Sequence, residues 1–184
     1  MRKRKLEDIA DIVQGIPVSR IRTGEAMELE ERIVYSFESE SKVLIAKNGD
    51  KLGQKIPLVE RDMILFNIVS YNAKKATEKD LGKIVPSNYV IVRLRDRNIS
   101  PDYLAWYMDQ AEGFKRELNK LRQGSAVLSI PINEFRKIDL RLPSLEVQDR
   151  IGKINKLKER RKNLFLEREE LIEKAMVIIN EEEL

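Results

Sequence analysis

The sequence contains no cysteine and no histidine. A chain without cysteine cannot form disulfides or use a thiol nucleophile, and a chain without either residue lacks the usual ligands of a zinc site. The absence of histidine also removes the commonest general base. The phosphate-binding patterns GxxxxGK[ST] and GxGxxG do not occur either. Any catalysis would rest on carboxylates or lysines, and we expect no cofactor and no metal.

Long apolar runs are absent as well. No stretch reaches the ~18 apolar residues of a membrane-spanning helix. The first 13 residues are basic, but they lack the apolar centre of a signal peptide. We therefore expect a soluble, cytoplasmic protein with no membrane partner.

Charge is unevenly distributed along the chain. The net charge is +4, and residues 144–184 hold 9 Lys and Arg against 10 Asp and Glu. Residues 1–143 hold the other 26 and 21, which is a net charge of +5. This excess is ordinary for the length, but it marks the front part as the first place to look for a nucleic-acid contact.

Residues 1–143 predict a mainly β domain with a few short helices, so the fold class is α+β. The period of apolar residues predicts helices over 5–13, 101–111 and 113–121, with Ser100 as N-cap and Pro101 in the first turn of the second. Asn133 is expected to cap a short turn. Runs rich in branched and aromatic residues predict strands over 32–37, 42–47, 55–60, 62–70, 89–95 and 138–142.

Residues 144–182 predict one long helix with Ser144 as its N-cap. At ~1.5 Å per residue such a helix is roughly 54 Å long, and it outruns a domain whose radius of gyration is about 15 Å. A wide apolar stripe follows it for more than four heptads, so we expect it to pair with a second molecule. The expected interface is Ile151, Ile154, Leu157, Arg161, Leu164, Phe165, Arg168, Leu171, Ile172, Ala175 and Ile178. The arginines either pair with glutamates across this seam or are simply solvated.

Three segments in order carry a resemblance. The first is a helical segment that carries Ile99, Pro101, Tyr103, Leu104 and Tyr107, and the second is a loop with Gly124 and Ser125. The third is a strand at 138–142 that is followed by Pro143, Gln148 and Ile151. In this order they resemble the specificity subunits of type I restriction–modification systems. The resemblance covers most of the chain, from about Leu6 to about Ile179.

The resemblance implies a non-catalytic protein that recognises double-stranded DNA. Methyltransferase subunits, with or without a restriction subunit, would be its partners. Members of the family have two recognition domains and two antiparallel helices, whereas this sequence has one of each. It therefore looks like half of a subunit that forms a homodimer, joins another half-subunit or is a remnant. The "IINEEEL" end favours a self-contained half, and a two-fold pair would read a split palindrome.

Polar loops offer candidate DNA contacts. Each mixes lysines or arginines, which suit phosphates, with side chains that can read base edges. Asn72, Arg122 and Gln123 are the preferred base readers. The basic "RKRK" start is read as a flexible tail or, at most, a non-specific phosphate contact. Loops of this composition are also common as simple solvated surface. The candidates are Arg20, Arg22, Lys47, Asn48, Lys51, Tyr71, Asn72, Lys74, Lys75, Lys120, Arg122, Gln123 and Ser125.

Two alternatives remain open at this point. One is a Mg²⁺-dependent nuclease that uses carboxylates such as Glu60 and Asp62, although these residues look like a turn that leads into a strand. The other is a coiled-coil adaptor that does not bind DNA. Trp106 and its helix are read as core, and Arg93 and Arg95 as the solvent side of a strand.

Overall fold

The structure is a computed structural model in which residues 2–21, 29–46, 56–122 and 130–182 are described. Its centre is a four-stranded antiparallel sheet with the order β2-β7-β5-β6. The strands are β2 (Ala10–Gln14), β7 (Tyr89–Leu94), β5 (Ile64–Asn67) and β6 (Ala73–Lys75). Strands β5 and β7 were predicted, but the sequence segment that forms β6 was read as part of a polar loop.

Both faces of the sheet are covered. Successive residues of β7 face opposite sides of the sheet. Val90 and Val92 belong to one buried cluster, and Tyr89 and Ile91 belong to another. This explains why β7 is apolar at successive positions instead of alternating with polar residues. The pattern gives way to Arg93 at the end of the strand, which pairs with Glu60.

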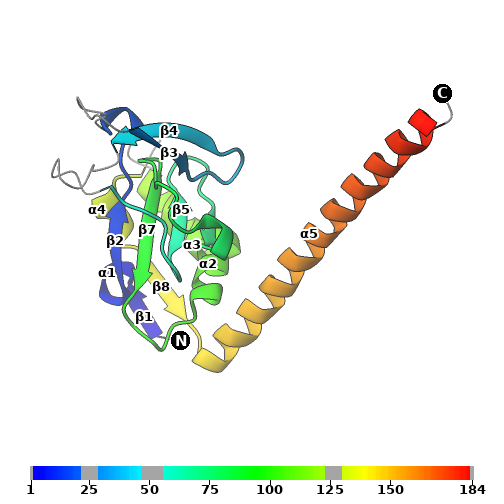
Figure 1. Ribbon diagram of the computed structural model, residues 1–184. Coiled ribbons are helices and arrows are strands. Elements are labelled where there is room, and N and C mark those ends of the chain that lie inside the picture. Colours follow the sequence, from blue (N-terminus) through cyan, green and yellow to red (C-terminus); the bar gives the residue numbers. More distant parts are fainter. Residues whose placement is uncertain (1, 22–28, 47–55, 123–129, 183–184) are drawn as a thin grey trace.

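Helices cover the first face (Figure 1). They are α2 (Pro101–Gln110), α3 (Glu112–Arg122) and α4 (Ile132–Arg136). The Phe66 ring on the sheet lies 4.8 Å from that of Phe135 on α4 and 5.8 Å from that of Phe114 on α3. Ser100 caps α2 as predicted, because its Oγ accepts a hydrogen bond from the Tyr103 amide. The predicted cap at Asn133 is wrong, since Pro131 holds that position.

A second layer lies against the other face. Strands β3 (Leu29–Val34) and β4 (Ser41–Ala46) form a hairpin. Its connecting segment carries Tyr35 and Phe37, whose rings pack edge-on against Tyr89. Burial raises the pKa of the Tyr35 hydroxyl well above its ordinary value. Short 3-10 turns, η1 (Val18–Arg20) and η3 (Glu78–Asp80), complete this layer. The strand predicted over 55–60 is wrong, since its described part makes only a bridge from Leu58 to Ile84.

The N-terminal segment departs most from expectation. The helix predicted over 5–13 is one turn, α1 (Leu6–Ile9), between strands β1 (Arg2–Lys5) and β2. Strand β1 pairs with β8 (Asp139–Leu142) in a separate two-stranded sheet, so the "RKRK" segment is not a tail. The predicted strand before the long helix exists, but it pairs with β1 and does not return to the main sheet.

Helix α5 (Leu145–Glu182) follows β8 and extends away from the rest of the molecule (Figure 1). Its first turns pack against α2, and the exposed apolar residues further along show that it does not fold back on its own domain. The backbone amide of Gln148 donates to the Ser144 carbonyl, so Ser144 stands at the N-cap position that was predicted for it. Within the described residues, no helix is both long and apolar enough to span a membrane.

Candidate nucleic-acid and pairing interfaces

The turn between β5 and β6 carries two of the predicted DNA contacts. Buried Asn67 organises this turn, because its Oδ1 accepts hydrogen bonds from the amides of Val69 and Ser70 at 2.9 and 3.1 Å. Tyr71 adopts a positive φ of 58°, and the Asn72 carbonyl accepts from the Asn67 amide. The turn is therefore a rigid platform at the edge of the sheet.

Asn72 itself is partly committed to this turn. Its Oδ1 accepts a 2.6 Å hydrogen bond from the Ser70 hydroxyl. Adenine readout by asparagine needs both the amide oxygen and the amide nitrogen. The oxygen of the Asn72 side chain therefore helps to hold the turn in shape, and its NH₂ group is the part that could donate to a base.

The two lysines on β6 have different surroundings. Lys75 lies between Asp62 and Asp102, at 3.2 and 3.3 Å, and only 27% of its side chain is exposed. Such a neutralised lysine is a poor phosphate contact. Lys74 is exposed, and its Nζ lies 4.8 Å from the centre of the Phe37 ring. Of the two, Lys74 is the better candidate.

The remaining candidates are scattered or outside the described residues. Arg20 ends η1 and is exposed, while Lys120 lies on α3 and pairs with Glu117 at 2.8 Å. Arg122 ends α3, but its side chain is not described. The following candidates lie outside the described residues: Arg22, Lys47, Asn48, Lys51, Gln123 and Ser125.

The structure gathers basic side chains on the β1–β8 sheet that the sequence reading did not place together. Lys3 pairs in register with Arg141 and Lys5 with Asp139, which places these four side chains on one face. The hydrogen bond from Lys3, together with the charges of Lys5 and Lys120, lowers the pKa of Asp139. We call Lys3, Lys5, Lys120 and Arg141 the β1–β8 basic surface. The signal was present in "RKRK", but it required knowing that this segment is a strand.

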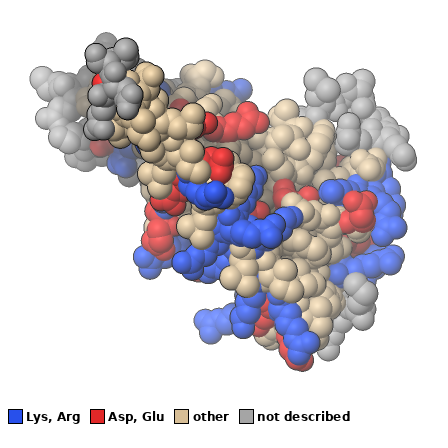
Figure 2. Space-filling view, turned by 90° about the vertical axis from the view of Figure 1, so that its right-hand side faces the viewer, with Lys and Arg blue, Asp and Glu red and all other residues tan. Residues whose placement is uncertain are grey.

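Acidic and basic side chains are mixed elsewhere. In Figure 2, groups of Lys and Arg are interrupted by Asp and Glu over the face shown. A cleft of about 650 Å³ is lined by β6, α2 and the first turns of α5, with Trp106, Lys74 and Asn155 among its residues. Trp106 is only partly buried, so it is a wall of this cleft as well as a neighbour of the core.

The apolar stripe of α5 is largely exposed. Leu157, Leu164, Leu171 and Ile178 are 67%, 55%, 59% and 55% exposed. Ile154, Phe165 and Ile172 are also exposed, as are the arginines at 161 and 168 and Ala175. Ile151 differs, because it is half-buried against the core of its own domain. The exposed part of the stripe therefore begins after Ile151.

Arg93 and Arg95 lie on the solvent side as predicted, with side chains 38% and 53% exposed, but both are paired with carboxylates. Arg93 pairs with Glu60 at 3.2 Å, and Arg95 pairs with Asp11 at 3.4 Å and donates to the Glu7 carbonyl. Glu60 and Asp62 flank a turn before β5, as predicted. In the part of the chain that the structure describes, no group of three or more carboxylates could hold a metal ion.

Solved structures of known function share this fold. No protein-family model and no curated protein matches the sequence. The chain superposes on a structure described as the type I restriction–modification system in assembly and conformational transition, with a TM-score of 0.57 and 14% identity over 89% of this chain. It also superposes on the type I specificity subunit from M. genitalium, with a TM-score of 0.57 and 14% identity over 89% of this chain. A third match is the HsdS subunit from Thermoanaerobacter tengcongensis, with a TM-score of 0.53 and 14% identity over 86% of this chain.

The predicted likeness to type I specificity subunits is thereby confirmed at the level of the fold. The matched region is 43%, 41% and 37% of those chains, so this chain spans less than half of their length.

Proposed function

We propose that the chain is a half-size DNA-specificity subunit without catalytic activity of its own. Its domain would recognise one part of a double-stranded DNA target, and methyltransferase subunits, with or without a nuclease, would act there. The observation that carries this proposal is the combination of a specificity-subunit fold with a single α5 whose stripe is exposed from Ile154 to Ile179.

The exposed stripe supports pairing of two copies through α5. Two helices that cross antiparallel would form a closed two-fold pair and cover each other's apolar residues. Such a pair presents two domains in opposite orientations, so its target would be an interrupted palindrome. A different half-subunit could take the place of the second copy.

DNA contact is proposed for two parts of the described surface. Lys74 on β6 and the neighbouring turn at Tyr71 and Asn72 are candidates for a contact near the bases. The β1–β8 basic surface, with four cations around Asp139, suits phosphates. No carboxylate cluster among the described residues favours a nuclease.

The test is selection of bound duplexes from a random library by the purified protein, followed by anisotropy titrations at several salt concentrations. We expect one enriched, interrupted palindrome and a steep salt dependence. Lys74→Ala should weaken binding about 5- to 10-fold on the selected site, whereas Lys79→Ala, a lysine on the nearby η3 turn, should not. Cutting of DNA by the chain alone with Mg²⁺ would overturn the non-catalytic assignment. Absence of any DNA binding would leave the adaptor alternative.

A further inference from the structure

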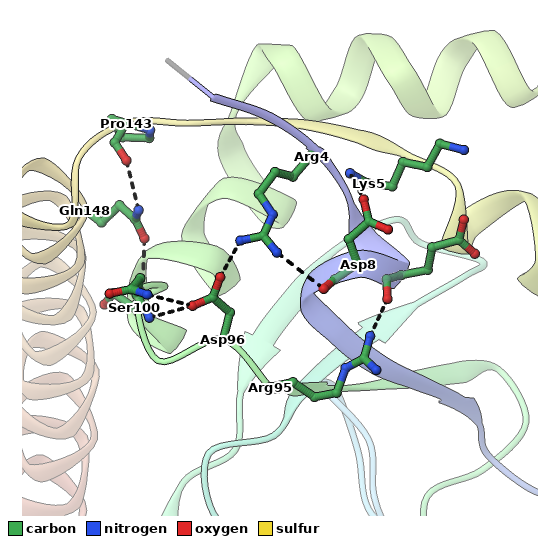
Figure 3. A network of polar contacts seen from close by, with 10 residues as sticks. Arg4, Lys5, Asp8, Arg95, Asp96, Ser100, Pro143 and Gln148 are labelled. Atoms are coloured by element: carbon green, nitrogen blue, oxygen red, sulfur yellow. Dashed lines mark hydrogen bonds and ion pairs between the residues drawn. The ribbon is translucent and has the colours of Figure 1, made fainter.

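Helix α5 leaves the domain through a short, polar and closely packed junction. Gln148, on its first turns, is only 2% exposed. Its Oε1 accepts a hydrogen bond from the Ser100 amide at 3.1 Å, and its Nε2 donates to the Pro143 carbonyl at 3.0 Å (Figure 3). A single side chain therefore connects α5 to the N-cap of α2 and to the residue that directly follows β8. We call Ser100, Pro143, Gln148 and Gly152 the elbow.

Gly152 brings the two helices close together one turn later. A Cβ at this position would lie 3.1 Å from the Asp102 Cβ and 3.2 Å from the Tyr103 amide nitrogen. Even a methyl group here would require its neighbours to shift slightly, and a large side chain would push α5 away from α2. Asp102 also holds Lys75 of the sheet at 3.3 Å, so the surface against which Gly152 packs is itself fixed.

The support continues on the domain side of the elbow. Asp96 lies a few residues before Ser100 and accepts hydrogen bonds from the Asn98 amide at 2.9 Å and from Arg4 of β1 (Figure 3). These contacts lower the pKa of the Asp96 carboxyl, the Asn98 amide being the larger cause. The loop that presents the Ser100 amide is thereby tied to the N-terminal strand. Beyond Asn155, every described residue of α5 but one is classed as exposed, so the elbow is where its direction is set.

We propose that the elbow fixes the angle between α5 and the domain, and that this angle sets the spacing between the two half-sites of the DNA target. The inference rests on the proposed function. In a pair joined through α5, each domain turns about its own elbow. A tilt of about 10° moves a point ~30 Å away by about 5 Å, which exceeds the ~3.4 Å step between base pairs. Gln148 and Gly152 are thus positioning residues for specificity that need not touch DNA.

Two variants change the elbow in different ways. Gly152→Leu adds volume against α2 and should shift the angle to a new value, while leucine keeps the helix intact. Gln148→Ala leaves the Ser100 amide and the Pro143 carbonyl without this partner and should broaden the distribution of angles. Lys153→Leu is the matched control, because it places the same side chain on the adjacent exposed position.

The angle can be measured without DNA, because the sequence has no cysteine to interfere with labelling. Spin labels at Arg116→Cys on α3 and Glu173→Cys on α5 report an intrachain distance when the labelled chain is diluted with unlabelled protein. We expect a shift of several ångströms in Gly152→Leu, a broader distribution in Gln148→Ala and no change in Lys153→Leu. Unchanged distances in both elbow variants would overturn the elbow itself.

The spacing is then measured by selecting bound duplexes whose half-sites are separated by different numbers of base pairs. Gly152→Leu should change the preferred spacing by one or two base pairs, Gln148→Ala should accept a wider range, and the half-site bases should stay the same. A shifted distance with an unchanged spacing would refute the proposal. If the unchanged protein selects no spaced site, the proposed function fails instead, and the label distances still test the elbow.

Discussion

At the scale of single residues, the molecule commits most of its well-placed charges to its own structure. Lys83 is 8% exposed and pairs with Glu40 and, at 3.0 Å, with Asp80. Burial pushes the pKa of Asp80 upward, but hydrogen bonds from Thr77 and Lys83 outweigh it and the pKa is lowered. The sequence next to Lys83 does not distinguish it from a solvated lysine, because its partner Glu40 is 43 residues away.

Replacement of Lys83 by methionine should lower the free energy of unfolding by on the order of 2 kcal/mol at pH 7, since it leaves two carboxylates without their cation. The folded-state pKa of Asp80 lies below its ordinary 3.8, so its contribution is present above about pH 4 and is lost as the pH falls through the folded value. The difference from the unchanged protein should therefore shrink at pH 3. Urea unfolding at both values measures it, with exposed Lys79→Met as the control. Equal effects of the two substitutions would contradict the pairing.

At the scale of elements, the sequence predicted those whose signals are local. The Ser100–Pro101 cap, the apolar run of β7 and the unbroken helix after Ser144 needed no long-range information. The N-terminal segment failed because Leu6, Ile9 and Ile12 fit a helical period, while pairing of β1 with β8 involves residues more than 130 positions apart. Ion pairs between distant elements could not be predicted for the same reason: Lys75 looks free in the sequence, but Asp102 reaches it from another element.

Removal of residues 2–5 separates the two readings of the N-terminus. A flexible tail could be removed without cost, whereas loss of β1 uncovers β8 and breaks the contact of Arg4 with Asp96. We expect the free energy of unfolding to fall by on the order of 2 kcal/mol. The double variant Lys3→Thr/Lys5→Thr keeps a strand-forming backbone and should have a much smaller effect. An unchanged denaturation midpoint in the truncated chain would show that β1 contributes nothing.

At the scale of the whole molecule, the described residues form a compact domain joined to a helix that is exposed along most of its length. Leu164 and Leu166 are 55% and 56% exposed, yet only Leu164 lies in the stripe of the proposed pair. The two leucines are two residues apart, which is about 200° around an α-helix, so they lie on nearly opposite faces and a charge on one face leaves the other intact. These two leucines therefore test the assembly with nearly matched exposure.

Leu164→Glu should convert a pair near twice 21.5 kDa into a 21.5 kDa monomer, as measured by light scattering on a sizing column. Leu166→Glu should leave the mass of the pair unchanged, because its side chain points away from the seam. DNA binding by the monomer should weaken about 100-fold or more, since the two half-sites are no longer held together. A monomer at high concentration before any substitution would exclude self-pairing and direct attention to a different half-subunit.

The pairing of β1 with β8 has a further consequence for how copies can be joined. It holds the N-terminus beside the start of α5, while the C-terminus lies at the far tip of that helix (Figure 1). In an antiparallel pair, the tip of one α5 approaches the base of the other, where the second chain begins. A short linker could therefore fuse two copies head to tail without stretching either one. Such a single-chain tandem would let each domain be changed independently, turning a symmetric reader into one with two different half-site preferences.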